Sequence, residues 1–382
     1  MKSQAETECF DAIVLGAGPA GSATALTLAR AGRRVALVDR AGRRPFPVGE
    51  ALPPAARPLL HGLGVLETFL TGPHLPSYGN LSAWGSDELR STDFLRDPNG
   101  HGWHLDRAAF DGLLRDQALE AGATLYSASD GGRVERLADG GWRLRDEMLP
   151  EGGPLSGRWL VDCTGRASRL ARSLGVRRLR TDRLVGYVAH FGPPAGTRVE
   201  DAERLTLIEA SPEGWWYTAA VPGGSRVAAY LTDVGERSGR LAATVTGFEG
   251  LIEQTRHVRE RLRAGGFTLS SRPHAVAAHT ARLARSTGDG WLAAGDASLS
   301  FDPLSSQGLF HSLASGLSAG RALADKLGGS GDALDQYEEE CASIFQAYLR
   351  HRADVYGQER RWTGNGFWER RLSSEMQLPP LA

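Results

Sequence analysis

The amino-acid sequence predicts an α/β protein, α+β overall, in which a parallel sheet is combined with a second, antiparallel sheet and with helices near the C-terminal end. Three features support this fold class. They are a strand–turn–helix–strand pattern within residues 10–40, a run of strands without an intervening helix between residues 184 and 232, and helical periodicity from residue 306 onward. A chain of 382 residues is long enough for two consecutive or interleaved domains.

Composition excludes several classes of protein. With 41% hydrophobic and 23% charged residues, the chain is globular rather than disordered or collagen-like. Its 44 basic and 45 acidic residues balance, so nucleic acid is not an expected partner. Three separated cysteines without a CxxC pair predict neither disulfides nor a metal site. Glycine and proline interrupt the apolar span 13–29, and the first residues are acidic, so we expect no membrane span, no secretion signal and a cytoplasmic location.

The pattern in residues 10–40 contains a glycine-rich turn between a strand and a helix. Gly16, Gly18 and Gly21 form a GxGxxG motif, and Asp39 ends the second strand. The first glycine permits a tight turn, the second lets a pyrophosphate approach the backbone, and the third lets the helix pack closely. The helix start can bind an anion, and Asp39 can accept from ribose hydroxyls. This predicts a dinucleotide site; a turn that only packs a helix is the alternative.

The elements after residue 100 are predicted from the spacing of their apolar, charged and turn residues. An amphipathic helix is expected over 106–121, with short strands at 124–127, 132–137, 142–144 and 159–161. The second sheet is predicted as antiparallel from alternating strands at 185–191, 205–209, 215–221 and 226–232. Then come a basic helical segment at 242–264, a strand at 291–294, a long helix at 306–327 and a helical tail at 335–371.

A second motif follows the strand at 291–294. Gly295 and Asp296 come directly after it, and a loop containing Pro303 leads to a helix in which Gly308 and small residues at 312, 316 and 320 form a smooth ridge. The start of a helix favours negative charge, such as that of a reduced isoalloxazine. Ordinary packing of a helix on a sheet is the alternative.

Together these residues resemble the glutathione-reductase-type FAD fold of flavoprotein monooxygenases, flavin-dependent halogenases and geranylgeranyl-reductase-like enzymes, over residues 10–370. Asp39 corresponds to the acid that binds the adenosine ribose, and Asp296 to the aspartate that holds the ribityl chain. Arg107, in a segment similar to the family's R-x-x-F-D helix start, corresponds to an arginine near FAD, although a surface ion pair is the alternative. The resemblance implies a FAD site containing Gly16, Gly18, Ala20, Gly21, Asp39, Arg107, Asp296, Pro303 and Gly308.

The same resemblance divides the chain into domains. It implies a discontinuous FAD-binding domain made of residues 8–50, 100–182 and 275–334. Residues 51–99 and 183–274 would form a substrate domain, and residues 335–382 a C-terminal helical segment.

Two segments depart from the hydroxylase pattern. Residues 162–168, DCTGRAS, replace the DG motif and look more like the halogenase and reductase version, so direct reduction by NADPH is in question. NAD(P)H and reduced flavin from a separate flavin reductase both stay open as electron sources. Residues 214–222 are similar to the halogenases' WxWxIP strand with a wider gap before the proline. With residues 49–54, 302–308 and 367–368, they are most similar to halogenase-like flavoproteins of quinone-cofactor maturation, which hydroxylate a tryptophan in a partner protein.

Lysine occurs only at positions 2 and 326. Flavin halogenases use a pocket lysine to handle hypohalous acid. Lys2 lies near the N-terminal end of the chain, and Lys326 lies about five turns from the start of its helix. Halogenation is therefore disfavoured.

Candidates for catalysis and substrate binding are few. Glu50 lies in a loop that resembles one near the flavin edge, and it is the best candidate for a polar group beside the substrate. A capping or ion-paired carboxylate is the alternative. Trp215 and Tyr217 share one face of a strand, where they could line an aromatic pocket or belong to the core.

These features predict a FAD-dependent monooxygenase that hydroxylates an aromatic or indole-bearing substrate, free or carried on a peptide or protein. The resemblance implies O₂ as oxidant and a C4a-hydroperoxyflavin as the oxygenating species. The alternatives are an alkene or isoprenoid reductase, a halogenase, or a flavin-binding partner without turnover.

Overall fold

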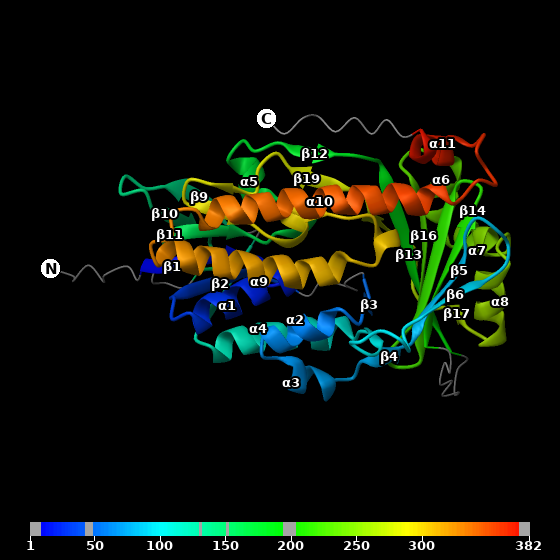
Figure 1. Ribbon diagram of the computed structural model, residues 1–382, viewed down its shortest axis with the longest axis horizontal. Helices are drawn as coiled ribbons and strands as arrows, with labels where there is room; N and C mark the ends of the chain where they lie inside the picture. The colour runs from blue at the N-terminus through cyan, green and yellow to red at the C-terminus, as the bar shows by residue number, and fades with distance from the viewer. Residues whose placement is uncertain (1–8, 43–48, 130–131, 150–152, 194–203, 374–382) are drawn as a thin grey trace.

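The computed structural model describes residues 9–42, 49–129, 132–149, 153–193 and 204–373. Two sheets with separate cores form the two ends of the molecule, and long helices connect them (Figure 1). The predicted fold class, with its parallel and antiparallel sheets, is confirmed. No helix among the described residues has the length and apolar character needed to cross a bilayer.

The first sheet is built around β1 (Cys9–Leu15), which is parallel to β2 (Val35–Arg40) and β11 (Leu155–Asp162). Alternate β1 side chains enter two different cores: Ala12 and Val14 one, Ile13 and Leu15 the other. The strand order is β20–β21–β11–β1–β2–β8, with β8 (Thr124–Ala128), β20 (Thr287–Gly288) and β21 (Trp291–Ala293) at its sides and the hairpin of β9 (Arg133–Arg136) and β10 (Trp142–Arg145) paired to β11.

Helices cover one face of this sheet. They are α1 (Pro19–Arg30), α4 (Arg107–Glu120), α9 (Gly308–Leu327) and the first part of α10 (Ala333–Gly357). The two short helices α2 (Ala56–Gly62) and α3 (Leu66–Leu70) also pack into this core through Leu60 and Phe69, although residues 51–99 are expected in the substrate domain. Only β5 (Gly79–Ala83) and β6 (Arg90–Asp93) of that stretch join the second sheet.

The second sheet has the order β17–β13–β16–β15–β14–β5–β6, with β18 paired to β13. Its members after β6 are β13 (Leu184–Gly192), β14 (Leu205–Ser211), β15 (Gly214–Val221), β16 (Ser225–Asp233), β17 (Thr268–Leu269) and β18 (His274–Ala277). The expected antiparallel pairing holds except for β5, which is parallel to β14. The sheet is therefore mixed at one side.

One face of the second sheet is covered by three helices, where a single basic helix over 242–264 is expected. They are α6 (Arg237–Ala242), α7 (Val245–Ile252) and α8 (His257–Ala264). The hydroxyl of Thr244 accepts from the Gly247 N–H and begins α7. The carboxylate of Glu209 accepts from the N–H groups of residues 256–258, at 2.7–3.0 Å, and begins α8. Separate N-terminal caps divide the segment.

Shorter elements lie between the two sheets. The strands β3 (Ala51–Leu52), β4 (Leu75–Ser77) and β7 (Gly102–His104) form one small sheet, and β12 (Arg178–Arg180), β19 (Ala281–Leu283) and β22 (Leu299–Ser300) form another. The helix α5 (Arg169–Ser173) precedes β12.

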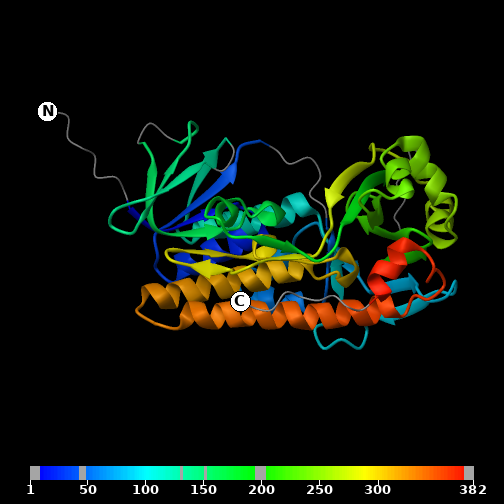
Figure 2. The ribbon, with the colours of Figure 1, turned by 90° about the horizontal axis from the view of Figure 1, so that it is seen from above.

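Helix α10 lies beside α9 in both ribbon views and reaches both cores (Figures 1 and 2). Its Phe345 and Tyr348 belong to the core of the first sheet, and its Tyr356 belongs to that of the second. There Tyr356 packs with Phe367 and Trp368 of α11 (Gly366–Leu372). The predicted helical tail thus joins the two halves of the molecule.

Candidate functional site

A cavity of about 450 Å³ is lined by residues from both halves of the molecule. Its walls come from the starts of α1 and α9, the segments after β11 and β21, and strands β13, β15, β16 and β18. Eight of the site residues expected from the sequence line it: Gly18, Ala20, Glu50, Arg107, Tyr217, Asp296, Pro303 and Gly308.

The glycine-rich turn before α1 forms one wall. A Cβ on Gly16, whose φ is +103°, would lie 2.3 Å from the Cys163 carbonyl oxygen, and a Cβ on Gly21 would lie 1.8 Å from the Gly16 oxygen. No heavy atom lies within 4 Å of a Cβ built on Gly18. Gly16 and Gly21 therefore permit close packing outside the lining, whereas Gly18 leaves room beside a helix start that has no side-chain cap.

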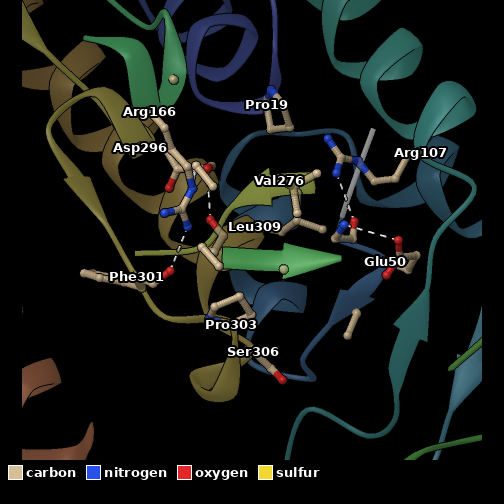
Figure 3. Close-up of a pocket in the computed structure, with 18 of the residues that line it drawn as sticks. Pro19, Glu50, Arg107, Arg166, Val276, Asp296, Phe301, Pro303, Ser306 and Leu309 are labelled. Carbon is tan, nitrogen blue, oxygen red and sulfur yellow. Dashed lines mark hydrogen bonds and ion pairs between the residues drawn. The ribbon is translucent and has the colours of Figure 1, made fainter. Parts of the chain in front are cut away.

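Arg107 occupies the first turn of α4. Its Nε and Nη2 atoms bind the carboxylate of Asp111 at 3.1 and 3.0 Å, and its Nη1 donates to the Gly49 carbonyl oxygen at 2.9 Å. Arg107 thus lines the cavity near Glu50 while it forms an ion pair within its own helix (Figure 3). It also orients Gly49, the residue before Glu50.

Glu50 and Tyr217 form a hydrogen-bonded pair in the cavity wall. The Glu50 side chain is 5% exposed; the Gly49 N–H donates to its Oε1 and the Tyr217 hydroxyl to its Oε2, each at 3.2 Å. Burial raises the pKa of Glu50, and the nearby Arg107 charge opposes this in part. Burial, followed by the Glu50 carboxyl, raises the pKa of Tyr217. Burial therefore favours the protonated form of Glu50, whereas the hydrogen bonds from Tyr217 and Gly49 favour the ionised form.

Asp296 and Arg166 meet at the side of the cavity opposite Glu50 (Figure 3). Arg166 Nε lies 3.3 Å from Asp296 Oδ2, and its two Nη atoms donate to the carbonyl oxygens of His279 and Phe301 at 2.7 and 2.8 Å. Asp296 lies in a 3-10 turn without a side-chain cap, so its carboxylate is not a helix cap. Sequence reasoning did not single out Arg166, although it lies in the DCTGRAS segment.

The loop that leads into α9 is fixed from behind by α10. Asp302 is 1% exposed, and its carboxylate accepts from the Leu304 N–H at 3.0 Å and from the Tyr356 hydroxyl at 2.7 Å. Arg352 Nε lies 3.4 Å from Asp302, and Nη2 lies 3.1 Å from Asp182. These buried contacts hold the loop whose residues Pro303 and Ser306 line the cavity.

The predicted small-residue ridge of α9 contacts α1. A Cβ on Gly316 would lie 2.5 Å from the Ala20 carbonyl oxygen, and one on Gly320 would lie 2.6 Å from Thr27 Cβ. The ridge therefore serves close helix packing, and this packing brings the starts of α1 and α9 to the same cavity.

Apolar side chains line the part of the cavity next to the second sheet, and sequence reasoning missed them. They are Val188, Val227, Ala229, Leu231 and Val276. Their only signal in the sequence is strand alternation, which buried core residues share. Trp215 does not line the cavity: its side chain is 0% exposed and donates to the Tyr356 hydroxyl at 3.0 Å. Asp39 also lies outside the lining, at the end of β2.

These residues fit FAD. The uncapped start of α1 and the guanidinium groups of Arg107 and Arg166 suit a pyrophosphate, and Asp296 can accept from hydroxyl groups. The open space beside Gly18 gives a ligand access to the backbone. No group of His, Cys, Asp and Glu residues within the described ranges could hold a metal ion.

Comparison with known proteins agrees with this fit. The family model described as FAD binding domain matches residues 9–352. A Marinomonas mediterranea protein named FAD-dependent oxidoreductase LodB is 31% identical, over 95% of this chain and 97% of its own. The flavin-dependent halogenase armH3 of Armillaria mellea is 26% identical, over 91% of this chain and 73% of its own.

A solved structure is also similar. The peptidyl tryptophan dihydroxylase QhpG, described as essential for tryptophylquinone cofactor biogenesis, is 26% identical with a TM-score of 0.70. The alignment covers 95% of this chain and 79% of that one. The chain therefore belongs to the FAD binding domain family and is an enzyme of the flavin-dependent oxidoreductase class.

Proposed function

We propose that this protein is a FAD-dependent monooxygenase that hydroxylates an aromatic or indole-bearing substrate. The observation that carries the proposal is the buried pair of Glu50 and Tyr217, which lies in the cavity wall close to the Arg107 charge. The similarity to a peptidyl tryptophan dihydroxylase supports an indole as the substrate group and a peptide or protein as its carrier.

In this proposal, bound FAD supplies the reaction of reduced flavin with O₂. Gly16 and Gly21 hold the turn, Gly18 and Ala20 give the pyrophosphate access to the start of α1, and Asp39 binds the adenosine ribose. Asp296 binds the ribityl hydroxyls. At the start of α9, Pro303 and Gly308 present a positive helix end to the pyrimidine side of the flavin.

The remaining lining residues act on the substrate. The apolar side chains of β13 and β16 hold an aromatic ring and exclude water from the reacting atoms. The carboxyl group of Glu50, whose pKa is raised by burial, would donate its proton to an oxygen atom beside that ring, and the Tyr217 hydroxyl holds the carboxyl group in position. Arg107 orients the loop through the Gly49 carbonyl.

Electron supply and location belong to the proposal as well. NAD(P)H, directly or through a separate flavin reductase that provides reduced flavin, is the electron source. The proposed location is the cytoplasm, because Cys9, Cys163 and Cys341 are free thiols, as expected in a reducing compartment.

Halogenation is the second candidate, because a flavin-dependent halogenase is among the relatives. The described lining residues include no lysine. Lys326 lies 18 residues beyond the Gly308 start of α9, about 27 Å along the helix, and Lys2 lies outside the described residues.

The test supplies FAD-loaded protein with NADH, a flavin reductase, isotopically labelled O₂, bromide and a tryptophan-containing peptide. We expect a peptide product that carries one or two labelled oxygen atoms and no bromine, as measured by mass spectrometry. Glu50→Gln should lower product formation while FAD remains bound. A stoichiometric brominated product, or a product without labelled oxygen, would contradict the monooxygenase.

A further inference from the structure

Two arginines contact Asp296, and a third lies close to one of them at the surface. Arg166 lines the cavity and binds Asp296. Arg178 Nη2 donates to the Asp296 carbonyl oxygen at 3.0 Å, and its Nη1 donates to Ser168 Oγ. Arg180 follows on the same face of β12 and is exposed. We call Arg166, Arg178 and Arg180 the arginine cluster.

The folded protein holds these like charges close together. Burial, with the charges of Arg166 and Arg180, lowers the pKa of Arg178 to about 10 against the opposing effect of Asp296. The same two arginines add to burial in lowering the pKa of His279 to about 4. His279 contacts the cluster through its carbonyl oxygen, which accepts from Arg166. An anion near the cluster would relieve this repulsion.

The surface next to the cluster is also basic. Residues 166–183 contain seven arginines and one acid, in a chain whose net charge is -1. That acid, Asp182, binds the buried Arg352 and faces away from solvent. Arg177, Arg180 and Arg183 are exposed, and none of them forms an ion pair with a described residue. The strands β12 and β19 that carry this surface lie beside α5 (Figure 1).

We propose that the arginine cluster captures the dianionic diphosphate of FAD from solution and guides it into the cavity. The proposal rests on FAD as the ligand of the proposed function and adds the route by which FAD enters. Exposed charges near a site raise the association rate constant, whereas buried contacts set the dissociation rate constant. Arg180 is exposed and unpaired within the described residues, so we expect it to act on the association rate constant. Arg166 lies in the cavity wall, so we expect it to act on the dissociation rate constant.

The experiment measures FAD association with apoprotein by stopped-flow quenching of flavin fluorescence. Arg180→Glu should slow association roughly three- to tenfold at low salt and leave dissociation unchanged. Its association rate constant should also depend less on ionic strength, because screening acts on the attraction that the variant has lost. Arg180→Gln should give an intermediate rate, and this variant keeps the test valid if the reversed charge disturbs folding.

The matched control is Arg321→Glu. Arg321 is also exposed, and it lies on α9 nine residues, about 14 Å along the helix, beyond Ser312, the last residue of α9 that lines the cavity. The control should associate with FAD like the wild type. Equal slowing in Arg321→Glu and Arg180→Glu would show a general charge effect and overturn the proposal, as would a faster dissociation alone.

A second arm separates FAD from other diphosphate-bearing dinucleotides. NADPH, added before FAD, should not slow FAD association with the wild-type protein. If it slows association there but not in Arg180→Glu, the cluster binds the nicotinamide donor and FAD is the wrong ligand. Failure of FAD to bind wild-type protein would instead remove the proposed function itself, so the two failures are distinguishable.

Discussion

At the scale of single residues, the raised pKa of the Glu50 carboxyl group has the widest consequences for the cavity. Burial raises the pKa of this carboxyl group more than Arg107 and Tyr217 lower it. In the unfolded chain the same group ionises near its usual pKa of about 4.3. Folding therefore favours proton uptake at Glu50, and this links the stability of the protein to pH.

Glu50→Gln should remove this pH dependence. Above the unfolded pKa, the unfolded wild-type chain has released the proton that the folded protein still holds. The free energy of unfolding of the wild type should therefore fall as pH rises through the folded pKa, whereas that of Glu50→Gln should fall less. Urea unfolding of the apoproteins between pH 4 and 8 measures the difference. Glu249→Gln, at an exposed position on α7, is the control and should follow the wild type. Parallel curves for all three proteins would contradict the raised pKa.

Asp296→Ala should weaken FAD binding and lower the stability of the apoprotein only slightly, because the apoprotein loses a partly exposed ion pair with Arg166. Charge-assisted hydrogen bonds from sugar hydroxyls contribute about 1.5–3 kcal/mol, so the dissociation constant should rise roughly ten- to hundredfold. Asp296 makes no capping bond whose loss would destabilise the apoprotein. FAD titration and the melting temperature of both apoproteins test this. The control Asp289→Ala removes an aspartate that is 93% exposed and paired with Arg136, and should bind FAD normally. Unchanged affinity with a lower melting temperature would assign Asp296 a structural role.

Sequence reasoning placed the residues that follow a recognisable motif and missed those that depend on distant contacts. Gly18, Asp296 and Gly308 line the cavity because each lies beside a glycine-marked turn. Arg166 has no such mark, since its contacts come from His279 and Phe301, more than 100 residues away. Trp215 and Tyr217 share a face as predicted, but their hydrogen-bond partners are far away in the sequence. Trp215 donates to Tyr356 in the core, whereas Tyr217 donates to Glu50 at the cavity.

At the scale of elements, β1, α1 and β2 follow from periodicity because glycines mark the turns between them, whereas β11 begins four residues before the strand expected at 159–161. The segment 242–264 does not follow in this way. Its division into α7 and α8 depends in part on Glu209, which caps α8 from β14, 47 residues earlier in the chain. The parallel pairing of β5 with β14 also depends on chain segments more than 100 residues apart. Local sequence patterns do not predict contacts between segments so far apart in the chain.

Arg352→Gln should lower both stability and FAD affinity. The substitution leaves Asp302 and Asp182 buried without the cation that lies between them. Loss of one partner from a buried ion pair costs about 3–5 kcal/mol, and here it also loosens the loop of Pro303. Urea unfolding and FAD titration measure the two effects. The control is Arg350→Gln, at an exposed position two residues earlier on the same helix, and it should change neither the stability nor the FAD affinity. Equal behaviour of the two variants would show that α10 does not position the loop.

At the scale of the whole molecule, the cavity belongs to neither sheet alone. Segments that follow β11 and β21 of the first sheet line it together with strands of the second sheet, the Glu50–Tyr217 hydrogen bond joins the loop at residue 50 to β15, and α10 packs into both cores. The sequence predicts both sheets, but it does not predict which apolar strand residues face the cavity, because these resemble core residues until the two sheets are assembled.

FAD should therefore stabilise the whole molecule in one step. At a free FAD concentration of 100 times the dissociation constant, the free energy of unfolding should rise by about 2.7 kcal/mol. Tryptophan fluorescence reports on the cores of both sheets, since Trp103, Trp142 and Trp291 lie in those of the first and Trp84, Trp215 and Trp368 in that of the second, and far-ultraviolet circular dichroism reports on the whole chain. Both signals should shift to the same higher denaturant midpoint. Two separate transitions, only one of which responds to FAD, would contradict this coupling.

The position of α10 and α11 also has a consequence during synthesis. The loop at Asp302 lacks its buried arginine until Arg352 has been added, and Asp233 of the second sheet lacks its partner until Arg371 has been added. At about 5–20 residues per second, the ribosome needs roughly 4–14 s to proceed from Asp302 to Arg371. Asp302 lacks its cation for the first 50 of these 69 residues and Asp233 lacks Arg371 for all of them, while the earlier strands can already pair. A nascent chain should therefore acquire its flavin only at the end of translation, and a stalled ribosome should present an unfinished cavity to chaperones.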